Sequence, residues 1–176
     1  MTDMIVLIEP LIPALRRYAR SLMRDRSAAD DLLQDCLERA VSHWHQRRDD
    51  GNARTWMFTI LHNLAINRLQ KTARRGVHLD IDDASDPALS GRPTQEDGLH
   101  QQDVLRALKT LPEEQRNVIL LVSVEDLSYA ETAKVLGIPI GTVMSRLARG
   151  RERLRQVLEG EVNNKIENGP HLRRVK

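Results

Sequence analysis

Apolar residues recur at helical spacing along most of the chain. Between Ile5 and Met23, interrupted by Pro10 and Pro13, they predict a short apolar start followed by an amphipathic helix. No stretch alternates between apolar and polar residues in the way that indicates a half-buried strand. The pattern therefore predicts an all-α protein.

Two further helices are predicted before residue 76. Ser27 and Asp30 are expected to cap the first of them, which should run to about Trp44. Its inward side is expected to consist of Ala29, Leu33, Cys36, Leu37, Ala40 and Trp44. An Asn52 cap should open the next helix, which should end between Lys71 and Arg75. Its buried residues are expected to be Met57, Ile60, Leu61 and Leu64.

The second half of the chain is predicted to form a separate helical unit. Residues 76–98 have neither helical period nor enough apolar residues to pack, which predicts a flexible linker. Helices are then expected over 99–108 and 113–124, separated by Leu111-Pro112, and the tail after Gly160 is expected to fray. The expected organisation is two small helical bundles, residues 1–75 and 99–160, joined by a flexible acidic linker over 76–98 and followed by a polar tail over 161–176.

A helix-turn-helix is predicted near the C-terminal end. Ser128 and Glu131 form a capping box, and Gly137 should end that helix in a left-handed conformation. Its inward residues are expected to be Ala130, Ala133 and Leu136. Pro139 suits the entry to a second helix, which should begin at about Gly141.

The second helix of this motif has one apolar and one basic side. The apolar side consists of Val143, Leu147, Leu154 and Leu158, and the opposite side of Thr142, Ser145, Arg146, Arg149 and Arg153. The major groove of DNA accepts such a helix. Arginine binds guanine edges there, while neighbouring cations bind phosphates. The alternative is an ordinary helical hairpin with a solvated arginine side. Five arginines and one glutamate between Arg146 and Arg155 favour DNA binding.

A second candidate nucleic-acid surface lies on the helix predicted after Asn52. One side of it is expected to carry Trp56, Thr59, Asn63, Asn67, Gln70 and Arg74. Amides, an aromatic ring and cations suit the separated strands of a nucleic acid, whose bases can stack or be flipped out. The alternative is that Trp56 and Phe58 pack in a core. Asn63 and Asn67 favour the functional interpretation, because asparagine is a poor residue for a helix interior.

The preceding helix is expected to present an acidic surface made of Asp31, Gln34, Asp35 and Glu38. A solvated helix surface is the default explanation for such a run. Because acids repel phosphate, a binding role would require a protein partner that carries arginines and lysines.

Charge is distributed unevenly, although the formal net charge is only +2. Residues 51–79 contain no carboxylate, whereas residues 80–103 contain seven acids and one arginine. This asymmetry predicts two basic surfaces separated by an acidic connector. The single cysteine, Cys36, excludes an internal disulfide and fits a reducing compartment. No membrane-length apolar run or signal peptide is visible, so a cytoplasmic protein without membrane insertion is expected.

Catalysis is not indicated. His43, His45, His62 and Cys36 have no recognised metal-binding spacing, and no phosphate loop or nucleophile motif occurs. The sequence therefore predicts neither an enzyme nor a metal or cofactor site.

Three segments together resemble the extracytoplasmic-function (ECF) sigma factors of bacterial RNA polymerase. DDLLQDCLERAVSHW, from Asp30, resembles the region-two helix that docks on the polymerase clamp. RTWMFTILHNLAINRLQKTARR, from Arg54, resembles the helix that melts the promoter and contacts the minus-10 element. LSYAETAKVLGIPIGTVMSRLARGRERL, from Leu127, resembles the region-four helix-turn-helix that contacts the minus-35 element.

The resemblance implies a sigma factor that directs transcription initiation, of stress-response genes in particular. Its partners would be core RNA polymerase (clamp and flap), promoter DNA that is double-stranded upstream and melted downstream, and an anti-sigma factor. The implied polymerase-binding residues are Asp31, Gln34, Asp35 and Glu38. The implied minus-10 residues are Trp56, Asn63, Asn67, Arg74 and Arg75, and the implied minus-35 residues are Thr142, Ser145, Arg146, Arg149 and Arg153.

Two other functions are alternatives to this interpretation. A sigma-like decoy would capture an anti-sigma factor without binding DNA, but it would have little reason to keep Arg146, Arg149 and Asn63. A conventional repressor or activator would need a dimerisation or ligand domain, which the sequence does not indicate.

Overall fold

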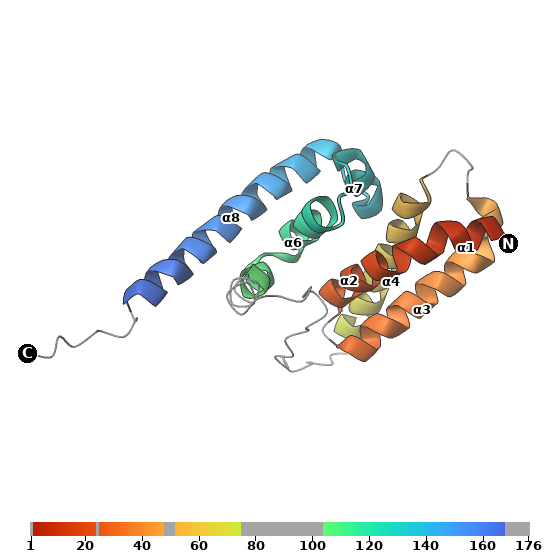
Figure 1. The fold of residues 1–176 in the computed structure, drawn as a ribbon, viewed down its shortest axis with the longest axis horizontal. Coiled ribbons are helices and arrows are strands. Elements are labelled where there is room, and N and C mark those ends of the chain that lie inside the picture. Colours follow the sequence, from red (N-terminus) through yellow and green to blue (C-terminus); the bar gives the residue numbers. More distant parts are fainter. Residues whose placement is uncertain (1, 24, 48–51, 75–103, 168–176) are drawn as a thin grey trace, which may run out of the picture.

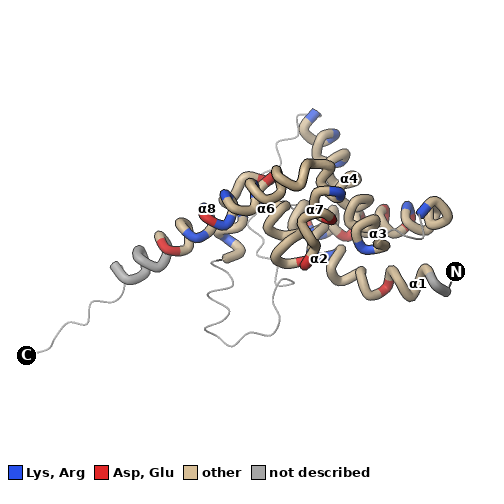
Figure 2. The backbone as a smooth tube through the Cα atoms, turned by 90° about the horizontal axis from the view of Figure 1, so that it is seen from above, with Lys and Arg blue, Asp and Glu red and all other residues tan. Residues whose placement is uncertain are grey.

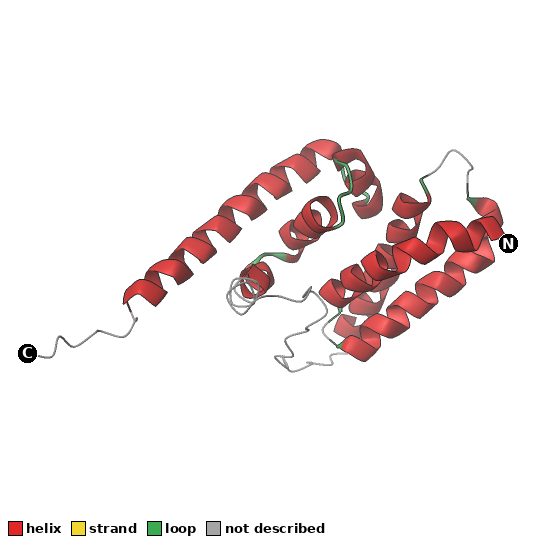
Figure 3. Cartoon of the chain, viewed as in Figure 1, coloured by secondary structure: helices red, strands yellow, loops and turns green. Residues whose placement is uncertain are grey.

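The computed structural model describes residues 2–23, 25–47, 52–74 and 104–167. Within these ranges the chain forms helices connected by turns and short loops, and it forms no strand (Figure 3). The predicted all-α class is confirmed there. The proposed linker over 76–98 lies outside the described residues.

The N-terminal bundle consists of α1 (Thr2–Ile8), α2 (Ile12–Leu22), α3 (Arg26–His43) and α4 (Ala53–Arg74). A 3-10 turn, η1 (Glu9–Leu11), separates α1 from α2, and a second, η2 (Trp44–Gln46), follows α3. Pro10 and Pro13 each lie at the start of an element, where their missing N–H groups interrupt no helical hydrogen bond. The interruption expected from these prolines is confirmed.

The N-terminal cap of α3 differs from the prediction. Asp25, rather than Ser27, is the cap residue: it has extended backbone angles, and its carboxylate accepts a hydrogen bond from the N–H of Ala28 at 2.8 Å. Asn52 caps α4 as predicted, because its Oδ1 accepts from the N–H of Arg54 at 2.9 Å. The core of the bundle also includes Leu32, which the sequence pattern did not assign to the inward side.

The C-terminal bundle consists of a helical segment over 104–110, α6 (Glu113–Ile119), α7 (Tyr129–Leu136) and α8 (Ile140–Glu167). The break at Leu111-Pro112 is present. A five-residue π-helical turn, η4 (Leu120–Val124), follows α6. The helix expected over 113–124 is therefore α-helical in its first part and π-helical in its second.

The helix-turn-helix has the predicted local geometry. Both hydrogen bonds of the Ser128/Glu131 capping box are made, and Gly137 has a φ of 65°, in the left-handed region. Ala130, which was expected to be inward, is exposed, whereas Thr132, Ala133 and Val135 are buried.

The last helix is longer than predicted. It does not end near Gly160 but continues to Glu167, and its distal part projects away from the other helices (Figures 1 and 2). Its proximal part packs closely on α6. A Cβ atom at Gly150 would lie 2.8 Å from Cδ1 of Ile119, so a glycine allows this approach.

The two bundles pack against each other, with α4 of the first against α7 of the second. Buried apolar side chains of both bundles form one cluster, from Leu15 and Phe58 in the N-terminal bundle to Val118 and Val143 in the C-terminal bundle. The apolar cores of the two bundles are therefore continuous in this conformation.

A buried hydrogen bond joins α2 to α4 near this junction. Tyr18 Oη and His62 Nδ1 are 3.0 Å apart, and both side chains are buried. Burial lowers the pKa of His62 to about 4 and raises the pKa of Tyr18. His62 is therefore neutral in the folded protein at neutral pH.

We expect His62 to make the stability of the fold depend on pH. The folded-state pKa lies below the usual value of 6.5, so the unfolded chain binds the extra proton first as the pH falls. The free energy of unfolding should decrease between about pH 6.5 and pH 4, by as much as about 3 kcal/mol. In His62→Gln this part of the decrease should be missing, as measured by urea unfolding across that range.

The exposed His45 provides the matched control. His45→Gln should keep the wild-type pH profile. Parallel profiles for wild type and His62→Gln would exclude His62 as the titrating group.

Candidate nucleic-acid interface

The basic side of α8 is largely accessible. Ser145, Arg149 and Arg153 are exposed, and Thr142 is half-buried. Ser145 Oγ donates to the carbonyl of Thr142 at 3.1 Å, and Arg149 Nε donates to the carbonyl of Ser145 at 3.2 Å. The first turns of the helix thus present hydroxyl and guanidinium groups on one side, as the sequence predicted. Basic and acidic positions are interspersed farther along α8 (Figure 2).

Arg146 differs from its neighbours because its side chain is only 22% exposed. Its Nη2 lies 2.8 Å from Oε2 of Glu114 on α6. It also lines a hollow of about 250 Å³ between the bundles, together with His62, Ile66, Glu113, Glu114, Asn117 and Leu136. In this conformation the residue expected to contact a base edge is engaged by a carboxylate of its own bundle.

The asparagines of α4 are placed as predicted. Asn63 and Asn67 are exposed and lie one turn apart, and Arg74 is exposed at the end of the same helix. Arg75 lies outside the described residues. These side chains form an accessible amide surface that ends in a cation.

The two aromatic residues of α4 have different environments. Phe58 is fully buried, so the core alternative holds for it. Trp56 is half-buried and contacts Trp44 edge to face, with ring centroids 5.8 Å apart. Trp56 retains an accessible part at the start of the helix.

The acidic side of α3 faces solvent throughout: Asp31, Gln34, Asp35 and Glu38 are all exposed. Gln34 Nε2 donates to Glu38 Oε1 at 2.9 Å, which orders two members of this surface. Their accessibility agrees with a protein-binding role and equally with a solvated helix surface.

Arg68 has a structural role that the sequence did not reveal. It extends from α4 to α3, where it donates to the carbonyls of Ala28 at 3.2 Å and Asp31 at 3.3 Å and pairs with the carboxylate of Asp35. A basic residue that charge pattern alone assigns to a nucleic-acid surface is thereby used to join two helices.

The sequence also did not indicate the polar contact between the bundles. Glu125, which precedes α7, is paired with Arg17 of α2 and Arg54 of α4. Glu131 of the capping box also accepts hydrogen bonds from Asn52 and Thr55. Hydrogen bonds from Ser128, first from its backbone, lower the pKa of Glu131, with smaller contributions from Thr55 and Asn52. No local pattern predicts these contacts, because each joins residues more than seventy positions apart.

The described part of the chain also bears on metal binding, cysteine reactivity and membrane insertion. No group of three or more His, Cys, Asp or Glu side chains is placed to hold a metal ion there. Cys36 is buried, and burial raises the pKa of its thiol to about 12. None of the described helices is both long enough and apolar enough to cross a membrane.

Family comparisons match both bundles. A family described as the Sigma2 domain of PhyR matches residues 8–62, and one described as Sigma-70, region 4, matches residues 101–154. The ECF RNA polymerase sigma factor EcfG of Rhodopseudomonas palustris is 35% identical over 147 residues, which cover 84% of this chain and 80% of that protein. The ECF RNA polymerase sigma factor SigM of Mycobacterium tuberculosis is 35% identical over 144 residues, which cover 82% of this chain and 71% of that protein.

Solved structures agree with the sequence comparisons. The sigma factor RpoE from Bartonella quintana, solved in complex with the anti-sigma factor NepR, superposes with a TM-score of 0.78 at 32% identity. The match covers 90% of this chain and 98% of that one. CnrH, solved in complex with the cytosolic domain of CnrY, superposes with a TM-score of 0.63 at 25% identity, covering 88% and 86% of the two chains.

The structural role of Arg68 can be tested by stability. Arg68→Gln should lower the free energy of unfolding by about 1–2 kcal/mol, because it removes hydrogen bonds that tie α4 to α3. Lys71→Gln, an exposed substitution one turn away with the same change in charge, should leave stability nearly unchanged. Equal effects of the two substitutions in urea unfolding would contradict this role.

Proposed function

This chain belongs to the ECF RNA polymerase sigma factors, and we propose that it binds core RNA polymerase and directs it to promoters that have a minus-35 and a minus-10 element. The observation that carries the proposal is the accessibility of three separate surfaces: the basic side of α8, the amide side of α4 and the acidic side of α3. Sigma factors are transcription regulators and not enzymes. A role on core polymerase would place the protein in the cytoplasm.

The basic side of α8 would contact the minus-35 element in the major groove. Thr142 and Ser145 supply small hydroxyl groups at the start of the helix, and Arg149 and Arg153 supply cations for phosphates. Arg146 would contact a guanine edge, for which its guanidinium must leave Glu114.

The exposed side of α4 would contact the melted minus-10 element. Asn63, supported by Asn67, can bind the edges of bases that no longer pair, and Trp56 offers a ring for stacking. Arg74 and Arg75 would bind the backbone at the end of the helix. The exposure of Asn63 and Asn67 and the partial exposure of Trp56 support this assignment.

The acidic side of α3 would bind core polymerase. Asp31, Gln34, Asp35 and Glu38 form a surface of carboxylates and one amide that repels DNA but suits a basic protein surface. We infer that this surface meets the polymerase clamp, and that the C-terminal bundle meets the flap.

An anti-sigma factor is a further proposed partner. Bartonella quintana RpoE, which resembles this chain over nearly its whole length, was solved in complex with the anti-sigma factor NepR. A protein that holds both bundles at once would block polymerase and promoter together.

Run-off transcription with purified core RNA polymerase on a promoter library tests the proposal. We expect the chain to start transcripts at defined sites that share two elements, and to bind the same DNA weakly without core polymerase. A sigma-like decoy would give no transcript and would still bind an anti-sigma factor. Absence of defined start sites with active core polymerase would refute the proposal.

The proposed role of Arg146 predicts a specific loss. Arg146→Ala should weaken promoter binding by the polymerase complex by about 1–3 kcal/mol and relax selection at one upstream base pair. Arg155→Ala is the control, because Arg155 is exposed on the same helix and pairs with Glu152 and Glu159. Selection measured across single-base promoter variants should change only in Arg146→Ala.

A further inference from the structure

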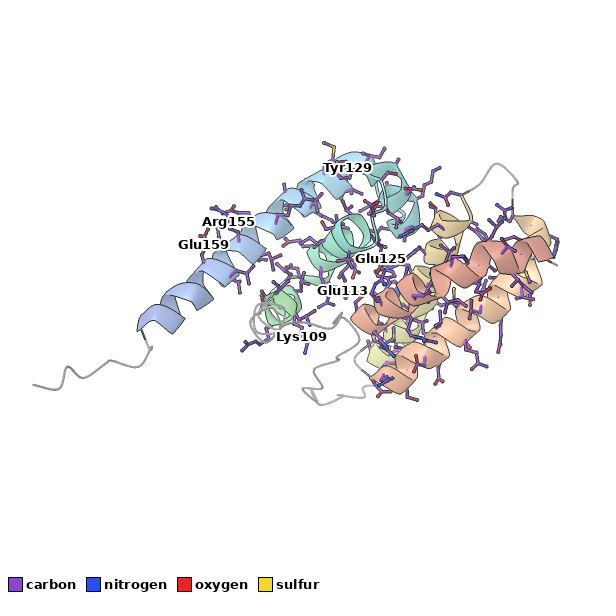
Figure 4. All side chains as sticks on the ribbon, viewed as in Figure 1. Lys109, Glu113, Glu125, Tyr129, Arg155 and Glu159 are labelled. Atoms are coloured by element: carbon purple, nitrogen blue, oxygen red, sulfur yellow. The ribbon has the colours of Figure 1, made fainter. Side chains whose placement is uncertain are left out.

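Glu125 is a charged residue with almost no access to solvent. Its side chain is 2% exposed, although it lies in the short connection between η4 and α7. Asp126, the next residue, has a φ of 51°, a left-handed conformation that aspartate tolerates better than most residues. The connection therefore turns sharply immediately after Glu125. The side chain lies on the side of the C-terminal bundle that faces α2 and α4 (Figure 4).

The side-chain partners of Glu125 come from the other bundle. Arg17 of α2 binds it in a bidentate manner, with Nε 3.1 Å from Oε1 and Nη2 2.9 Å from Oε2. Arg54 of α4 places its Nη2 4.0 Å from Oε2 and donates a hydrogen bond to the main-chain carbonyl of Glu125. A buried carboxylate is strongly unfavourable unless such partners compensate it.

A second carboxylate reinforces the junction. Oε1 of Glu131 accepts hydrogen bonds from Asn52 Nδ2 and from Thr55 Oγ1, the latter at 3.1 Å. Asn52 caps α4 and Glu131 belongs to the capping box of α7, so the N-terminal ends of these helices meet at one carboxylate. We call these contacts of Glu125 and Glu131 with Arg17, Arg54, Asn52 and Thr55 the interbundle contact.

The closed arrangement conflicts with simultaneous binding of both promoter elements. By their numbering the elements lie about 25 base pairs apart, which is roughly 85 Å along the duplex at 3.4 Å per base pair. Yet α4 and α7, which belong to the bundles assigned to the two elements, are in direct contact. In the same arrangement Arg146 lines the hollow beside His62 and Ile66 of α4.

We propose that the N-terminal bundle is an intramolecular docking partner of the C-terminal bundle, held by the interbundle contact, and that the free chain rests in this closed form. Binding to both promoter elements then requires the bundles to separate and Glu125 to become hydrated. Only this promoter consequence rests on the proposed sigma activity, since the closed form is a property of the free chain. A chain that is closed most of the time binds its targets more weakly, in proportion to its open fraction.

Small-angle X-ray scattering of the full free chain tests the proposal. The wild type should scatter as a closed particle. Glu125→Gln keeps the shape of the side chain but loses its charge, and it should raise the ratio of open to closed chains roughly ten-fold. Glu152→Gln on α8 removes the same charge from an exposed ion pair, and this variant should scatter like the wild type.

A double substitution separates the charge effect from a folding defect. Arg17→Gln leaves the Glu125 carboxylate buried with Arg54 as its remaining cation, so it should open the chain more than Glu125→Gln does. Adding Glu125→Gln to Arg17→Gln should partly close the chain again. Circular dichroism should show unchanged helix content in all variants.

Three outcomes would overturn the closed form. They are wild-type dimensions of an extended chain, equal dimensions of wild type and Glu125→Gln, and a double variant no more compact than Arg17→Gln. Transcription with core polymerase is measured separately. If Glu125→Gln opens the chain but the wild type starts no transcripts, the proposed sigma activity is refuted and the closed form is retained.

Discussion

At the junction of the two bundles, beside the apolar cluster that they share, one carboxylate is buried. Glu125 is almost fully removed from water, and the two arginines that compensate its charge both belong to the N-terminal bundle. Removing either arginine would leave a buried charge with one cation, whereas moving the bundles apart would return the carboxylate to water. The contact therefore favours two states, fully closed or fully open, over partial separation.

Charged residues in this protein serve different purposes according to their partners. On α4, Arg54 and Arg68 reach carbonyls and carboxylates of other segments, whereas Arg74 remains exposed at the end of the helix. On α8, Arg146 is held by Glu114 while Arg149 is exposed. A basic stripe in the sequence thus overstates the cationic surface that is available to DNA in the closed form.

The features that could be predicted from sequence are those set by neighbouring residues. The Ser128/Glu131 capping box, the left-handed Gly137 and the break at Leu111-Pro112 each depend on a few consecutive positions, and each is present. The prediction of Ser27 as the cap of α3 was wrong: the cap is Asp25, two residues earlier, and helical periodicity does not fix the first residue of a helix so closely. The roles of Arg68 and Glu125 could not be predicted, because their partners come from distant segments.

Separation of the bundles need not disturb the helices that meet at the interbundle contact. Glu131 uses Oε2 for the backbone and hydroxyl of Ser128 within its own capping box, and Oε1 for Asn52 and Thr55. Asn52 likewise uses Oδ1 for the N–H of Arg54 in its own helix and Nδ2 for Glu131. Each residue divides its polar atoms between a local cap and the distant contact. When the bundles part, α4 and α7 keep their caps, so opening costs the distant polar contacts and the apolar packing between the bundles but not the ends of the helices.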